Sequence, residues 1–339
     1  MGSFWFAINA VSPIIFMVAI GYLLKKIRLL NLELAKHLNK LVFHLFLPVM
    51  LFLNIYKIEE LGKIRFGYMA YAFSGILVIF AISLPVVLSV TSKGAHRGAI
   101  WQASFRSNFA LIGIPLAQSL CKEEGVAVAS LLSASTIPLL NVLAVVALSI
   151  FRKDGKKASI KKILLGVVEN PLIQSIFIGL AVLCIRAIFV QQEINFRLSE
   201  LKPLYTVLGY LSNLATPLAL ICLGAQFEFS AITSLRREIV AGTLMRTVVS
   251  PLLGLGLAFL FFRDHFSAAE FASLVAVFAT PVSVSSVPMA QEMDSDAALA
   301  GQLVVWTTLA SSLSIFLASF LLSLVGIFLA RRLLITAKT

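Results

Sequence analysis

The sequence predicts an all-α polytopic membrane protein with ten transmembrane helices, arranged as two inverted repeats of five helices. Of the 339 residues, 59% are hydrophobic and only 13% are charged, which is more apolar surface than one soluble core can bury. Apolar runs of about 20 residues, enough helix to cross a ~30 Å hydrocarbon core, recur along the chain. A proline-containing motif in one run returns in another, half a chain later.

The apolar runs place the ten helices along the chain with short loops between them. A membrane β-barrel would show alternating apolar and polar residues instead, so continuous runs indicate helices. No basic segment precedes the first run and no cleavage site follows it, so we expect that run to stay in the mature protein. The expected helices cover residues 4–24, 38–56, 66–90, 98–120, 126–151, 170–190, 204–226, 239–262, 268–290 and 298–330.

A basic hydrophilic linker at residues 152–169 divides the chain into a first repeat over residues 1–151 and a second over residues 170–339. Lys and Arg are enriched in cytoplasmic loops, so the cluster at 152–162 places the linker in the cytoplasm and both termini outside. The basic residues behind the formal charge of +12 collect in short loops, where they suit anionic lipid headgroups. No nucleic-acid partner is therefore expected.

The chain carries no pattern typical of an enzyme. Its three cysteines, Cys121, Cys184 and Cys222, have neither metal nor disulfide spacing. An intramembrane enzyme needs an acidic pair, a serine beside a base, or metal ligands inside the spans, and the acidic residues lie at span ends instead. We therefore expect no catalytic residue, no metal and no cofactor. A sensor that binds an anion on a transporter fold, without flux, is the alternative function.

The proline motif is part of a longer internal repeat. Residues 114–118, IPLAQ, return as residues 287–291, VPMAQ. Because each copy holds an odd number of helices, the second copy enters the membrane upside down, which is typical of secondary transporters. The other matches occur in the same order and pair Pro13 with Pro171 and Pro48 with Pro217.

These prolines predict that the fourth and ninth helices are broken inside the membrane. Pro115 cannot donate to the carbonyl of Leu111, and its ring clashes with that turn, at a cost of ~3 kcal/mol. Gly113 loosens the same turn. Pro281 and Pro288 free carbonyls in the ninth helix in the same way. The resulting half-helix ends offer N–H groups to an anion or carbonyls to a cation, so the sequence predicts a small polar site where the two helices cross.

Polar side chains near the breaks complete this predicted site. Asn108 offers an amide with both donor and acceptor capacity. An arginine in the middle of a span costs ~2.5–3.5 kcal/mol, so Arg106 either faces an aqueous cavity and attracts an anion or extends toward the inner surface. For Arg246 we favour extension to the surface. The predicted substrate-binding residues are Arg106, Asn108, Gly113, Pro115, Thr280, Pro281, Ser283 and Ser285.

A coupling ion, H⁺ or Na⁺, is a further expectation. Gln118 and Gln291 hold corresponding places just beyond the two breaks, and with Pro288 they are the candidate ligands for such an ion. His44 is the one histidine well inside a predicted span, and we interpret it as a packed polar residue before Pro48.

Residues 108–116, NFALIGIPL, resemble the fourth-helix crossover of the auxin efflux carrier family, which comprises plant PIN carriers and bacterial permeases for malate, malonate and related acids. The resemblance covers nearly the whole chain. The third span lacks the acid and the lysine of plant carriers, so auxin is not an expected substrate. Segments 43–55, 169–180, 214–227 and 279–293 are also similar to blocks of that family.

The resemblance implies a secondary active transporter of small mono- or dicarboxylates that works by an elevator mechanism. Spans one, two, six and seven would form a scaffold that mediates a homodimer, and the other six would form the moving transport domain. Asn108 would contact the substrate carboxylate, with Pro115 and Pro281 marking the crossing. The short linker is similar to that of bacterial members, which implies a plasma (inner) membrane protein of a bacterium.

Overall fold

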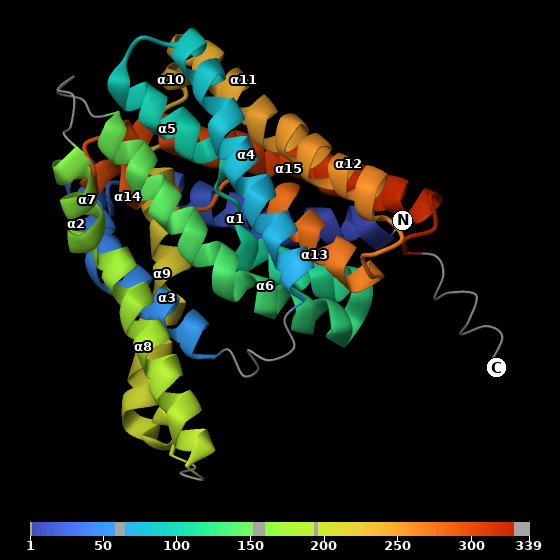
Figure 1. The fold of residues 1–339 in the computed structure, drawn as a ribbon. Helices are drawn as coiled ribbons and strands as arrows, with labels where there is room; N and C mark the ends of the chain where they lie inside the picture. Colours follow the sequence, from blue (N-terminus) through green and yellow to red (C-terminus); the bar gives the residue numbers. More distant parts are fainter. Residues whose placement is uncertain (1, 58–64, 152–159, 193–195, 329–339) are drawn as a thin grey trace.

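The computed structural model describes residues 2–57, 65–151, 160–192 and 196–328 (Figure 1). The described chain is all-helical and holds one isolated antiparallel bridge, between Ser107 and Val282. By length and composition, seven of its helical stretches can cross a membrane. They are Leu32–Tyr56, Phe66–Val90, Phe109–Ile150, Pro171–Val190, Lys202–Gln226, Arg236–Phe262 and Ala297–Leu324.

The helices follow one another with short connections. In chain order they are α1 (Gly2–Lys26), α2 (Leu32–Leu41), η1 (Val42–Phe46), α3 (Leu47–Tyr56), α4 (Phe66–Val90), α5 (Gly94–Phe105), η2 (Phe109–Gly113), α6 (Ile114–Ile150), α7 (Ile160–Glu169), α8 (Pro171–Gln191), η3 (Leu198–Glu200), α9 (Lys202–Gln226), α10 (Ser230–Ser234), α11 (Arg236–Leu244), η4 (Met245–Val249), α12 (Ser250–Phe262), α13 (Ala268–Phe278), α14 (Ser286–Glu292) and α15 (Ala297–Leu324).

Three of these segments, η1, η2 and η4, are π-helical turns of five residues, and each is followed by a proline two residues later. These prolines are Pro48, Pro115 and Pro251. A π turn inserts one extra residue into a helix, so the chain can accept a residue that lacks the N–H of the regular ladder. The helix therefore continues through each proline. The expectation that Pro115 breaks the fourth span is wrong, because η2 accommodates this proline and the break lies earlier, at residues 106–108.

The long helix α6 changes direction at Cys121 and Lys122, whose backbone angles are not helical. A Cβ atom on Gly125 would lie 2.1 Å from the carbonyl oxygen of Ala117. Eight residues span about 12 Å in a straight helix, so the chain folds back on itself at this point. The fourth predicted span thus ends near its expected boundary, and the remainder of α6 follows the fifth.

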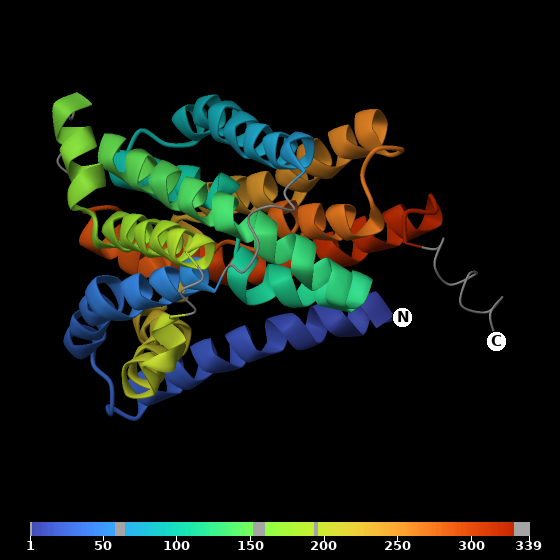
Figure 2. The ribbon, with the colours of Figure 1, turned by 60° about the horizontal axis from the view of Figure 1, so that its bottom comes forward.

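Two groups of helices pack side by side. The small group comprises α1, α3, α8 and α9, and α3, α8 and α9 lie together at the lower left of Figure 1. Figure 2 shows α9 against the C-terminal half of α1. A Cβ on Gly224 would lie 2.0 Å from the carbonyl oxygen of Val18, so the two backbones touch. Glycine permits this approach, as in other membrane helix pairs.

The large group comprises α4, α5, α6, α11, α12, α13 and α15. Its centre is α13, which packs mainly against α6 and whose residues from Ala269 to Phe278 are all buried. Apart from Glu270 and Ser273, α13 is apolar, and a helix that is apolar on all sides belongs in the interior. The large group therefore surrounds a helix that ends in the middle of the protein, next to the break at residues 279–285.

Candidate functional site

Two broken helices meet at the centre of the molecule. The first break separates α5 from η2 at residues 106–108, and the second separates α13 from α14 at residues 279–285. The two broken segments run antiparallel. The N–H of Asn108 donates to the carbonyl of Pro281 over 2.8 Å, and the N–H of Ser283 donates to the carbonyl of Arg106 over 3.2 Å. Each break thus supplies the hydrogen bonds that the other lacks, as backbone at membrane depth requires.

Arg246 binds the carbonyl groups left over where α5 and α13 end. Its Nη2 donates to Val277 O over 2.7 Å, its Nε to Thr280 O over 2.8 Å and its Nη1 to Phe105 O over 3.2 Å. The side chain is 1% exposed. The expectation that Arg246 extends to the membrane surface is wrong, because these buried carbonyls are strong acceptors closer at hand.

The prolines of the second break differ in effect. Pro281 removes the N–H that would bind the carbonyl of Val277, and that carbonyl accepts from Arg246 instead. Pro288 lies in the first turn of α14, after the break. The carbonyl of Val284, which we expected Pro288 to free, accepts the N–H of Val287 over 3.3 Å. Pro281 therefore acts at the break, and Pro288 lies within the first turn of the next helix.

Arg106 is the second buried arginine, at 3% exposure, and lies at the first break. Its Nη2 donates to Asn141 Oδ1 over 2.7 Å and to Ser285 Oγ over 2.9 Å, and its Nη1 to Ser286 Oγ over 3.3 Å. All three partners are neutral. Two interpretations were open for Arg106, facing an aqueous cavity or extending toward the inner surface. The structure favours the first, because the Arg106 side chain lines a cavity.

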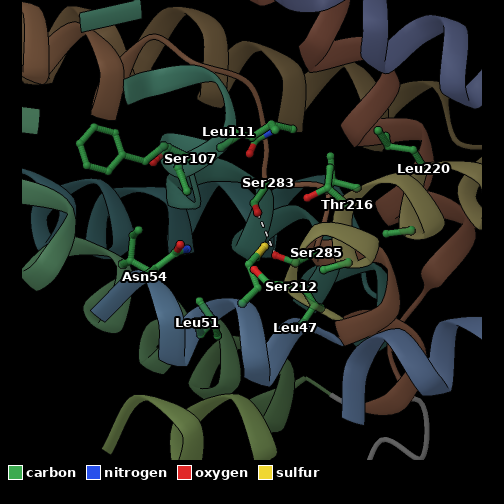
Figure 3. A pocket seen from close by; sticks show the side chains of 18 of the residues that line it. Leu47, Leu51, Asn54, Ser107, Leu111, Ser212, Thr216, Leu220, Ser283 and Ser285 are labelled. Carbon is green, nitrogen blue, oxygen red and sulfur yellow. Dashed lines mark hydrogen bonds between the residues drawn. The ribbon is translucent and has the colours of Figure 1, made fainter. Parts of the chain in front are cut away.

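A cavity of about 760 Å³ lies between the two groups of helices. The large group contributes Arg106, Ser107, Asn108, Asn141, Ser283 and Ser285 to its wall, and the small group contributes Asn54, Lys57, Ser212, Asn213 and Thr216. Figure 3 shows the Ser283 and Ser285 hydroxyls, 2.8 Å apart, in the same space as Ser212 and Thr216. Among the described residues, the charged members of the wall are Arg106 and Lys57, and none is acidic.

Two buried polar groups in this wall lack a hydrogen-bond partner within the described part of the chain. They are Nδ2 of Asn108, on a side chain that is 6% exposed, and Oγ of Ser107. Buried polar atoms are nearly always satisfied, so an unsatisfied pair beside a cavity indicates a ligand or water. A nitrogen and a hydroxyl in this position offer hydrogen-bond donors to an anion.

Of the other predicted site residues, some line the cavity and others are buried behind the residues that line it. Pro115 lines the cavity. Gly113 supports it, because a Cβ there would lie 3.0 Å from the Cβ of Ala276 on α13. Thr280 is fully buried behind the wall, and its hydroxyl donates to Ala276 O over 2.7 Å. The break residues Arg106, Asn108, Pro281, Ser283 and Ser285 are thus brought together, with Gly113 and Thr280 behind them.

The three candidate ligands for a coupling ion lie elsewhere. Gln118, Gln291 and Pro288 are all outside the cavity wall. The Gln291 amide nitrogen donates to Lys36 O over 3.0 Å, and its oxygen accepts from Asn39 Nδ2 over 3.2 Å. Gln118 is exposed. The described residues also include no group of three or more His, Cys, Asp or Glu arranged to hold a metal ion.

Sequence reasoning missed part of this wall. Ser107, Asn54 and Asn141 are not among the predicted binding residues. A polar side chain within an apolar run is the signal that could have identified Asn141, inside α6, and Asn54, near the end of α3. The sequence offers no comparable signal for Lys57, at the end of α3, because basic residues at span ends are common.

Comparison with known proteins gives two matches over nearly the whole chain. The model of a family described as "Membrane transport protein" matches residues 6–319. A protein named "Uncharacterized transporter" from Methanothermobacter thermautotrophicus is 23% identical over 333 residues, which is 93% of this chain and 98% of that protein.

Proposed function

Because this chain belongs to the membrane transport protein family, the auxin efflux carrier-like family, we propose that it is a secondary active transporter of small organic anions. The expected substrates are mono- or dicarboxylates such as malate or malonate. The observation that carries the proposal is the cavity wall, which holds two basic side chains and, among the described residues, no acidic one. The family is one of integral membrane transporters, so an enzymatic activity is not proposed.

The charge of Arg106 supports an anionic substrate. A buried ion is costly unless an opposite charge compensates it, and the partners of Arg106 are neutral oxygens. A carboxylate in the cavity would supply the missing charge. Such a pair is also the strongest kind of hydrogen bond available to an arginine.

The backbone beside Arg106 supports the same substrate class. The helix that begins at Phe109 starts in the cavity wall, which Phe109, Ala110 and Leu111 line. The first N–H groups of a helix lack acceptors within the helix and carry partial positive charge, which favours an anion. The unsatisfied amide of Asn108 adds a donor that selects a hydrogen-bonding ligand.

The position of the cavity between two helix groups supports alternating access. We propose that the large group moves as the transport domain against the small group as scaffold, in an elevator mechanism. The arrangement of ten spans as two inverted repeats, a homodimer through the scaffold and a bacterial inner-membrane location with both termini outside belong to the same proposal. A gradient of H⁺ or Na⁺ would drive transport.

The test is counterflow in proteoliposomes. Vesicles loaded with unlabelled malate, malonate or pyruvate should accumulate the same labelled acid, whereas amino acids and organic cations should not exchange. Asn108→Ala should abolish exchange without changing protein level or thermal stability. The matched control is Gln174→Ala, because Gln174 is also an amide side chain but is exposed and lies outside the cavity wall.

Two results would count against the proposal. Exchange of cations or neutral solutes in preference to carboxylates would refute the substrate class. Saturable carboxylate binding without exchange would instead favour the sensor function, in which the same cavity binds an anion but the helix groups do not alternate.

A further inference from the structure

The two breaks bring two helix C-termini to one place. The C-terminal end of α5, at Phe105, and that of α13, at Phe278, are held by one side chain, Arg246. Each helix end carries about half a negative charge, concentrated on its last carbonyl groups. Two such ends side by side repel each other unless a cation lies between them. In transporters with broken helices, carbonyls of this kind can coordinate a coupling ion.

In this chain the guanidinium of Arg246 fills that place. All three of its nitrogens donate to the carbonyls of Phe105, Val277 and Thr280, at 3.2, 2.7 and 2.8 Å. Ser250, one turn later, accepts from Arg246 Nη1 over 3.4 Å and donates to the carbonyl of Phe278 over 3.0 Å. The last carbonyls of α13 are therefore occupied by a side chain of the protein itself.

The local fold explains how an arginine reaches this position. Arg246 lies in the π turn η4, where the consecutive residues Met245, Arg246 and Thr247 are all buried. A π turn inserts one extra residue and so shifts the direction of the side chains relative to a regular helix. The guanidinium lies outside the cavity wall. It therefore contacts the broken helices and leaves the substrate space to Arg106.

We propose that Arg246 is the fixed cation of this crossing and takes the place of a soluble coupling cation at the ends of α5 and α13. It is a positioning residue, because it acts through the helix ends and not on the substrate. The consequence is that transport does not require Na⁺ at this point. This inference rests on the proposed transport function, but its stability test below does not.

The first experiment measures counterflow of labelled malonate by the wild-type protein in buffers that contain Na⁺ or choline. We expect rates that agree within about twofold, since the site holds no exchangeable ion. A strict requirement for Na⁺, with malonate exchange otherwise intact, would overturn the inference and leave the proposed function standing.

The second experiment replaces the fixed cation. Arg246→Ala should lower both the exchange rate, at least about tenfold, and the thermal unfolding temperature, and guanidinium at concentrations well below denaturing ones should restore part of both. Arg246→Lys should retain more activity and stability than Arg246→Ala, because it keeps a charge at the crossing. The matched control is Arg263→Ala, an exposed arginine beside Asp264, which guanidinium should not affect.

The outcomes separate the two claims. If no variant, including the wild type, exchanges any carboxylate, the proposed function fails, and rescue of the unfolding temperature by guanidinium still tests the fixed cation. A folded Arg246→Ala protein that shows no rescue, or that matches the wild type, refutes the inference. Should Arg246→Ala fail to fold, the Na⁺ dependence of the wild type and the unfolding temperature of Arg246→Lys decide whether Arg246 is the fixed cation.

Discussion

Arg106 and Arg246 are the two arginines that are buried among the described residues, and each contacts both breaks. Arg106 donates to side-chain oxygens, of Asn141, Ser285 and Ser286, and lines the cavity. Arg246 donates mainly to backbone carbonyls and lies outside the cavity wall. Helix C-termini already provide partial negative charge for Arg246, whereas the hydroxyl and amide oxygens that Arg106 contacts do not lie at a helix C-terminus. The same residue type at similar depth is thus a structural cation in one place and a binding group in the other.

The largest expected effect comes from removing the binding arginine. Arg106→Gln should lower the rate of carboxylate exchange by at least about a hundredfold, because a buried charge–charge interaction with the substrate is lost. Its unfolding temperature should equal or exceed that of the wild type, since no compensated charge is removed. Counterflow and thermal unfolding measured on one preparation check both parts. A large loss of stability would contradict the difference between the two arginines.

The same substitution at the structural arginine should lower stability, and with it the exchange rate, without altering the affinity for the substrate. Arg246→Gln leaves buried carbonyls at two helix ends without donors, at about 1–3 kcal/mol for each unsatisfied group. We expect a free energy of unfolding lower by about 3 kcal/mol, with the KM for the carboxylate unchanged in the fraction that remains folded. Chemical denaturation in detergent measures the first quantity, and initial exchange rates the second. A raised KM with unaltered stability would mean that Arg246 binds substrate.

A carboxylate placed beside Arg106 should imitate the substrate. Asn141→Asp puts a negative charge where Nη2 of Arg106 now donates to a neutral oxygen, over 2.7 Å. The new ion pair competes with the transported anion, so the KM should rise about tenfold while stability holds or improves. The control Asn141→Ser removes the amide without adding charge. Equal effects from the two substitutions would show that charge at this position is unimportant.

The smallest expected effects distinguish the hydroxyls that serve the two arginines. Ser285→Ala removes one acceptor of Arg106, and Ser250→Ala removes the hydroxyl that joins Arg246 to Phe278. Each lost hydrogen bond is worth about 1 kcal/mol. For Ser285→Ala this should appear as a several-fold change in KM, and for Ser250→Ala as a lower free energy of unfolding. Interchanged results would reverse the roles assigned to the two arginines.

Hydropathy alone predicted most of the helical segments. The helix α4 has the bounds expected from its apolar run, residues 66–90, and the ends of α3, α9 and α12 coincide with their predicted ends. This success has a simple cause, because a membrane helix must be apolar over the whole length of hydrocarbon that it crosses. The short helices α5, α13 and α14 could be grouped into spans, but where each ends could not be derived from hydropathy.

The position of the first break shows where local rules fail. Pro115 is a strong helix-breaking signal, yet the π turn before it absorbs the missing N–H, and the helix ends between Arg106 and Asn108 instead. What fixes the break there is pairing with residues 281–283, a contact between segments far apart in the sequence. A single sequence does not reveal such pairing.

The candidate site was predictable only in part: its conspicuous polar side chains could be identified from the sequence, but its backbone contacts could not. Arg106 and Asn108 are conspicuous in an apolar run, and the structure places both in the cavity wall. Most partners of Arg246 were not predictable, because they are backbone carbonyls, which every residue possesses. Gln118 and Gln291 were chosen from the repeat of a short motif, and the structure places both outside the cavity wall.

The pairing of the two broken segments bears on how this part of the protein can move. Asn108 donates its N–H to the carbonyl of Pro281, and the carbonyl of Arg106 accepts the N–H of Ser283. Separating the two segments would leave these groups without partners, which is heavily penalised at membrane depth. We therefore expect the two breaks to stay joined in any conformational change.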